Sequence, residues 1–128
     1  MIVVDTSVWL EAPRQRAIAD ALRQLIESDE AALALPVRLE LLEGMARSDR
    51  AAFRRVFAAL PQLHPTGETW TPIPGWIEKA NDAGECFGLV DLLIAAMAAE
   101  IGGLVWSLDK NFERMEKLEM VSLYALPH

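Results

Sequence analysis

The chain has 128 residues, 52% hydrophobic and 24% charged, which is typical of one globular domain with a substantial core and excludes a disordered chain. Its net charge of −7 argues against a general nucleic-acid binder, because phosphate contacts need basic residues, and favours a cluster of acids, a basic partner or plain solubility. No hydrophobic run approaches the ~20 residues that span a bilayer, the first residues do not form a signal peptide, and the single cysteine excludes an internal disulfide, so we expect a cytoplasmic protein outside the membrane.

Short apolar runs alternate along the chain with stretches of helical periodicity. Strands are predicted at 2–4, 31–35, 62–64, 104–107 and 120–124. Helices are predicted at 13–28, 37–46, 51–60, from Pro74 to Gly84, from Asp91 to the stop signal at Gly102–Gly103, and, as a short turn, at 111–115. Pro36 is placed to start one helix and Asp49 to cap the next.

Continuous apolar strands that alternate with helices are typical of a parallel sheet covered on both faces. The predicted fold is therefore α/β, a three-layer α/β/α sandwich with a central, mostly parallel sheet. We expect residues 1–128 to form one domain. Cys86 is expected to be a small buried hydrophobe.

Four carboxylates occur where such a sheet binds ligands, at the carboxyl ends of its strands. Asp5 directly follows the first strand, where an unpaired buried carboxylate would be costly, and Asp109 lies just beyond the strand that ends at Ser107. Asp91 lies in the first turn of the apolar helix that precedes that strand. Glu40 lies one turn into the helix after the second strand and is expected to point at the body of the protein.

Carboxylates gathered at one edge repel each other unless protons or cations neutralise them. Oxygen ligands without nearby cysteine or histidine favour Mg²⁺ or Mn²⁺ over zinc. The two histidines, His64 and His128, have no metal-ligand spacing, and no serine or cysteine has a plausible base.

Each acid also has a structural alternative. Asp91 can be a helix N-cap and Asp109 a turn former, while Glu43 competes with Glu40 for the inward position. Asp5 is the hardest to explain in this way. The cluster is favoured because all four acids occur together.

Four segments in order resemble the PIN-domain nucleases, specifically the VapC-type toxins of bacterial toxin–antitoxin pairs. They are VVDTSVW, LPVRLELLEG, GLVDLLIAAMA and VWSLDKNFERM, and the match covers nearly the whole chain. The resemblance implies a PIN-like domain and an endoribonuclease that depends on Mg²⁺ or Mn²⁺. It also implies a partner antitoxin, whose tail lays an apolar helix in a groove and offers Arg or Lys to the acids, and a homodimer.

Carried over by position, the catalytic acids of the family fall on Asp5, Glu40, Asp91 and Asp109. The resemblance implies that Asp5 and Asp91 hold the metal and that Thr6, Ser107 and Asn111 support the site. The motif places Gly four residues after its acid, which selects Glu40 over Glu43. Many relatives have an acid where this chain has Asn111, and this difference weakens the expectation of a second metal.

Basic residues must guide RNA past these acids, or else form ordinary solvated helix faces. They are Arg14, Arg16, Arg47, Arg50, Arg54, Arg55, Lys110 and Arg114. The four tryptophans suit a dimer interface, a partner groove or a plain core.

Other functions fit less well. A haloacid-dehalogenase-like phosphoryl transferase needs a second Asp where this chain has Ser7, and a receiver domain needs paired acids and a late lysine. The non-enzymatic alternative is a catalytically impaired PIN-like module that binds RNA or protein.

Overall fold

The computed structural model describes residues 1–126, so the prediction for His128 lies outside the described residues. The strands are β1 (Ile2–Val4), β2 (Ala31–Ala34), β3 (Gln62–Leu63) and β4 (Leu104–Trp106). The helices are α1 (Thr6–Glu11), α2 (Arg16–Glu27), α3 (Leu35–Gly44), α4 (Arg50–Ala58), α5 (Ile73–Asp82), α6 (Leu89–Glu100) and α7 (Lys110–Lys117), with 3₁₀ turns η1 (Arg47–Asp49) and η2 (Glu68–Trp70).

The strands form one sheet in the order β3-β2-β1-β4, and every pair is parallel. Ile2 is in register with Ala31 of β2 on one side and with Leu104 of β4 on the other. The chain therefore moves from β1 through β2 to β3 in one direction and later returns to the opposite side of β1. Such a change of direction is the usual place for a ligand site in an open α/β sheet.

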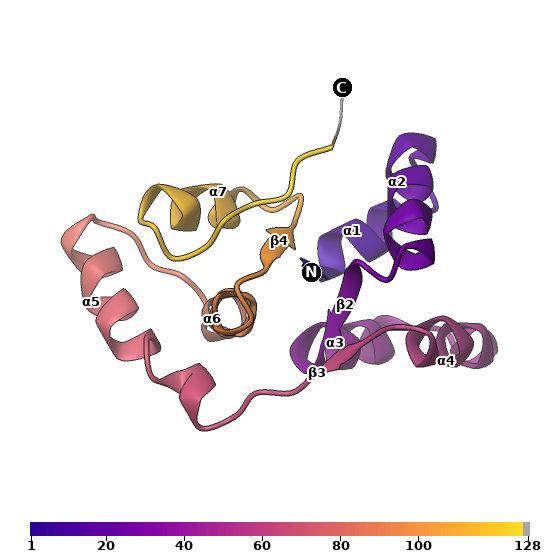
Figure 1. Cartoon of the computed structure of the whole chain (residues 1–128), viewed down its shortest axis with the longest axis horizontal. Coiled ribbons are helices and arrows are strands. Elements are labelled where there is room, and N and C mark those ends of the chain that lie inside the picture. Colours follow the sequence, from indigo (N-terminus) through magenta and orange to yellow (C-terminus); the bar gives the residue numbers. More distant parts are fainter. Residues whose placement is uncertain (127–128) are drawn as a thin grey trace.

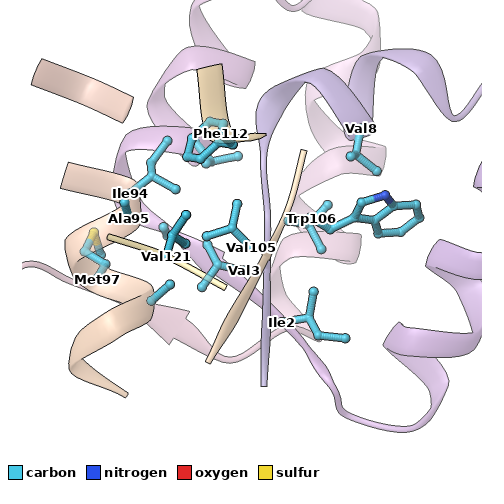
Figure 2. Packing of buried hydrophobic residues seen from close by; sticks show 14 of the residues in the cluster. Ile2, Val3, Val8, Ile94, Ala95, Met97, Val105, Trp106, Phe112 and Val121 are labelled. Atoms are coloured by element: carbon cyan, nitrogen blue, oxygen red, sulfur yellow. The ribbon is translucent and has the colours of Figure 1, made fainter. Parts of the chain in front are cut away.

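Helices cover both faces of the sheet, which confirms the predicted three-layer sandwich (Figure 1). Helices α5, α6 and α7 lie on one side and α1, α2 and α4 on the other. Along β1, Val3 points toward Ile94 and Phe112, whereas Ile2 points to the opposite face, as the period of two in a strand requires (Figure 2). Val3 and Ile94 are fully buried.

The predicted last strand, 120–124, is wrong. Among the described residues, this segment makes only an isolated bridge between Leu123 and Val105, with the Tyr124 amide donating to the Val105 carbonyl at 2.8 Å. Met120 and Val121 are adjacent and both buried. The segment is therefore held by side-chain packing and by this one bridge, whose other bond runs from the Val105 amide to the Ser122 carbonyl at 3.0 Å, and it forms no ladder.

Several local predictions also differ from the structure. Residues 6–11 form the unpredicted helix α1, which buries Val8 and Trp9 and leaves Leu10 exposed. Cys86 is exposed, not buried, because it lies in the irregular segment between α5 and α6. Asp49 is at the N-cap of α4 but its side chain makes no capping hydrogen bond. No helix within residues 1–126 has the length and hydrophobicity needed to cross a membrane.

Candidate functional site

Asp5 lies at the carboxyl end of the central strand, where it is also the N-cap residue of α1. Its side chain is buried, and its backbone amide donates to the Trp106 carbonyl at 2.9 Å. This bond extends the pairing of β1 with β4 by one residue. It places Asp5 beside Ser107, at the change of strand direction.

Two serine hydroxyls hold the Asp5 carboxylate by the same oxygen. Ser107 donates to Asp5 Oδ2 at 2.7 Å and Ser7 donates to it at 2.9 Å. The serine oxygens in turn accept the backbone amides of Asp109 and Leu108, both at 3.0 Å. Asp5 Oδ1 takes part in no hydrogen bond among the described residues, so this oxygen remains available to a ligand.

Ser7 was not among the predicted site residues. Its position two residues after Asp5, in the first turn of a helix, is the signal that could have identified it. From the sequence, Ser7 was significant only as the position where a second acid is missing, and the bond from its hydroxyl back to Asp5 was not predicted.

Glu40 lies on α3 and is exposed, so the prediction that it points at the body of the protein is wrong. Val37 and Leu41 face the core in its place. Glu40 instead turns toward α1, where its Oε1 accepts the Thr6 hydroxyl at 3.0 Å. Glu43 is also exposed and takes no part in this contact.

Asp91 is the third residue of α6, and Gly88 is the N-cap, so the alternative of Asp91 as N-cap is wrong. Burial raises the pKa of Asp91, and the charge of Asp5 raises it further. A hydrogen bond from Asn111 lowers this pKa, whereas Asp109 and then Glu40 raise it again. The four acids, here called the acidic cluster, are therefore close enough to repel one another.

The raised pKa of Asp91 has a testable consequence for stability. We expect the free energy of unfolding of the metal-free wild type, relative to Asp91→Asn, to increase as the pH falls from 7 toward 4. The folded protein binds this proton at a higher pH than the unfolded chain does, and stability therefore increases as pH falls through that range. Urea denaturation of both proteins in EDTA at several pH values measures this difference. A difference independent of pH would contradict the shift.

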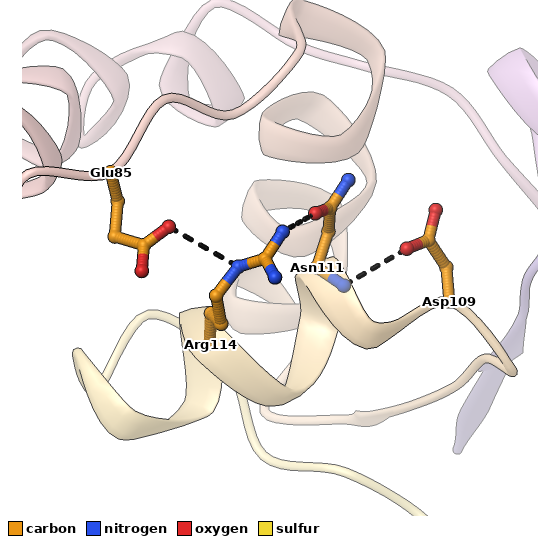
Figure 3. Close-up of polar contacts among 4 residues, drawn as sticks. All are labelled: Glu85, Asp109, Asn111 and Arg114. Carbon is orange, nitrogen blue, oxygen red and sulfur yellow. Dashed lines mark hydrogen bonds and ion pairs between the residues drawn. The ribbon is translucent and has the colours of Figure 1, made fainter.

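Asp109 is the N-cap of α7, and its Oδ1 accepts the Asn111 amide at 2.9 Å (Figure 3). Asp109 therefore starts a helix and is not the turn former of the structural alternative, and this capping role coexists with membership of the acidic cluster. Beyond it, Arg114 Nη2 donates to the amide oxygen of Asn111, while Arg114 Nε lies 3.2 Å from Glu85 Oε2. Arg114 is therefore engaged by its neighbours on both sides.

The acids and their neighbours have the chemistry of a site for a hard cation. Their donors are carboxylate oxygens, which Mg²⁺ and Mn²⁺ prefer, and a buried acid keeps one oxygen available. Among residues 1–126, no three His, Cys, Asp or Glu side chains are already arranged to hold a metal ion. The residue types fit such an ion, but their side chains have to move closer to one another to coordinate it.

An apolar groove lies away from the acidic cluster, between α1, α2 and α4. It consists of two adjoining hollows of about 250 and 480 Å³ that share Ala12, Pro13 and Leu22. The remaining lining residues are Trp9, Ala19, Arg23, Ile26, Glu27, Ala52, Phe53 and Val56. This surface is hydrophobic over most of its area and suits an apolar partner segment.

The remaining basic residues lie on the surface, away from the core. All of those singled out in the sequence are exposed, and Arg114 differs from the others only in its contacts with Glu85 and Asn111; the others are Arg14, Arg16, Arg47, Arg50, Arg54, Arg55 and Lys110. Four of them lie in or beside η1 and α4, which makes that region the most basic part of the surface.

Comparisons with known proteins give one family and one fold. A family model described as PIN domain matches residues 2–118. The structure of VapBC2 from Rickettsia felis bound to a promoter DNA fragment is similar over 97% of this chain and 98% of that chain, with 16% identity and a TM-score of 0.81. VapBC-1 from nontypeable Haemophilus influenzae is similar over 98% of both chains, with 18% identity and a TM-score of 0.76.

A third solved structure is described as a toxin–antitoxin complex from Klebsiella pneumoniae. It is similar over 86% of this chain and 88% of that chain, with 14% identity and a TM-score of 0.69. At these identities the solved structures support the fold alone. No curated protein sequence matches the chain.

Proposed function

Because the chain belongs to the PIN-domain family, whose model matches residues 2–118, we propose that it is a metal-dependent endoribonuclease and the toxin of a toxin–antitoxin pair. In this proposal residues 1–128 form one catalytic domain that works in the cytoplasm. The observation that carries it is the buried carboxylate of Asp5, which is held by one oxygen and lies near Asp91, the acid that also feels the charges of Asp109 and Glu40.

In this site Asp5 and Asp91 hold Mg²⁺ or Mn²⁺. Asp5 is suited to this role because Ser7 and Ser107 fix its carboxylate and leave Oδ1 available. Asp91 is suited because burial and then the repulsion of neighbouring acids raise its pKa, and a cation relieves that repulsion. The cation supplies Lewis acidity at the phosphate and lowers the pKa of bound water.

The other residues position the substrate side of the site. Hydrolysis of an RNA phosphodiester requires a group that accepts a proton from water, and Glu40, like Asp109, is an exposed carboxylate of the acidic cluster. The Thr6 hydroxyl orients Glu40 by donating to Oε1. Asp109 is fixed by its cap to Asn111, and so contributes its charge from a constant position.

The proposed antitoxin has two features to recognise. A hydrophobic segment of the antitoxin fits the apolar groove, and an Arg or Lys side chain pairs with the acidic cluster. The solved complex from Klebsiella pneumoniae, described as a toxin–antitoxin complex, supports a partner of this class. An acidic toxin with a basic partner also explains the net charge of −7.

We also propose a homodimer. Three acids of the cluster directly follow a large exposed hydrophobic residue in the sequence. These residues are Leu39, Val90 and Leu108, with 55%, 43% and 44% of their surface exposed. A second copy of the chain would cover them and enclose the acids.

The test is cleavage of transfer RNA, ribosomal RNA and messenger RNA pools by the purified chain. We expect cleavage with Mg²⁺ or Mn²⁺ that falls at least about 100-fold in EDTA and returns when the cation is restored, because the acids alone repel phosphate. A folded, metal-bound protein that cuts none of these pools would favour the catalytically impaired binding module.

A further inference from the structure

Arg114 lies beside the acidic cluster and is engaged on both sides of its guanidinium group (Figure 3). Its Nε lies 3.2 Å from Glu85 Oε2, and its Nη2 donates to the Asn111 amide oxygen. Glu85 comes from the segment between α5 and α6, so this contact ties α7 to a distant part of the chain. The two side chains are 44% and 32% exposed. Such a pair adds little stability, and its main effect is to fix the position of the guanidinium.

Asn111 connects Arg114 to the acidic cluster. Its amide oxygen is occupied by Arg114, which leaves the amide nitrogen as the side-chain donor toward Asp91, whose pKa Asn111 lowers. Its backbone amide donates to Asp109 Oδ1 at 2.9 Å. On this side of the acidic cluster, one oxygen of Asn111 and one of Asp109 are therefore already in use. On the opposite side, Asp5 Oδ1 accepts no hydrogen bond from the described residues.

We infer that Arg114 is a built-in cation of the acidic cluster and that the cluster therefore binds one divalent cation per chain, on the side of Asp5 and Asp91. Arg114 excludes a second ion in two ways. It occupies the Asn111 oxygen that this ion would need, and its positive charge repels a divalent cation at short range. Arg114 is a positioning residue, because it acts through Asn111. This inference rests on the proposed function, since it assumes that Asp5 and Asp91 hold the metal.

Substitutions at Asn111 and Arg114 separate these two effects. In Asn111→Asp the new carboxylate forms an ion pair with Arg114, because the two side chains already touch, and the cluster still binds one ion. In the double variant Asn111→Asp/Arg114→Met the new carboxylate has no such partner, and the built-in positive charge is gone. We expect a second divalent ion to bind there in place of the positive charge of Arg114. Lys117→Met removes one positive charge from the same helix at an exposed position and is the matched control.

The experiment counts bound Mn²⁺ per chain by isothermal titration and by electron paramagnetic resonance, with circular dichroism to verify folding. We expect one ion for the wild type, Asn111→Asp and Lys117→Met, and two for the double variant. Two ions in the wild type or in Asn111→Asp would overturn the inference, as would one ion in the double variant. These results would leave the proposed nuclease intact. A wild type that binds no Mn²⁺ and cuts no RNA would overturn the proposed function and this inference together.

Discussion

Asp5→Asn is expected to lower the rate of RNA cleavage by at least about 10³-fold while the protein stays folded. The substitution removes the negative charge at the centre of the proposed metal site. The asparagine oxygen can still accept the hydroxyls of Ser7 and Ser107, so the local hydrogen bonds are largely retained. The measurement is single-turnover cleavage of an RNA that the wild type cuts, together with circular dichroism and Mn²⁺ titration.

A carboxylate outside the site provides the control for this experiment. Asp82 is exposed at the end of α5, and Asp82→Asn changes the net charge by the same amount. We expect it to cleave RNA at the wild-type rate. Cleavage that survives Asp5→Asn would place the chemistry elsewhere or reveal a contaminating nuclease.

Val56→Glu is expected to weaken binding of the antitoxin by about 100-fold or more without lowering the rate of RNA cleavage. Val56 lines the apolar groove from α4 and is 39% exposed, so a glutamate there can remain in water in the free protein. A hydrophobic partner segment would bury that charge without a counter-ion, which costs several kcal/mol. Titration against the candidate antitoxin, taken as the product of the gene adjacent to the one that encodes this chain, measures the loss.

Ala51→Glu is the matched control for the groove. Ala51 is also exposed on α4 but does not line either hollow, so the same charge is added beside the groove and not within it. We expect it to bind the antitoxin like the wild type. Equal weakening by both variants would indicate a general charge effect and would contradict this location of the antitoxin site.

The sheet was predictable because its strands are short, continuously apolar and bounded by turn signals. Ala31–Ala34 is fully buried, as a short strand covered on both faces requires. The same reasoning failed for 120–124, where an equally apolar segment packs against the core without a ladder. Apolar composition predicts burial, whereas ladder pairing depends on the path of the neighbouring backbone.

The grouping of the acids was predictable in part. The rule for the carboxyl ends of parallel strands placed Asp5 and Asp109 at one edge, and the structure brings both close to Asp91. The orientation of Glu40 was not predictable from helical spacing, because Val37 and Leu41 already satisfy the core and leave it facing α1. The contact between Arg114 and Glu85 depends on the course of an irregular segment, for which the sequence has no periodic signal.

The central position of β1 governs when the site can form during synthesis. Asp5 is made early, yet the Ser107 hydroxyl that orients it is 102 positions later in the chain. β1 also lacks one of its two neighbours until β4 is available. A growing or truncated chain that stops before β4 therefore contains three of the acids but not their arrangement. If the proposed function holds, the site assembles only in the nearly finished polypeptide, and incomplete chains lack nuclease activity.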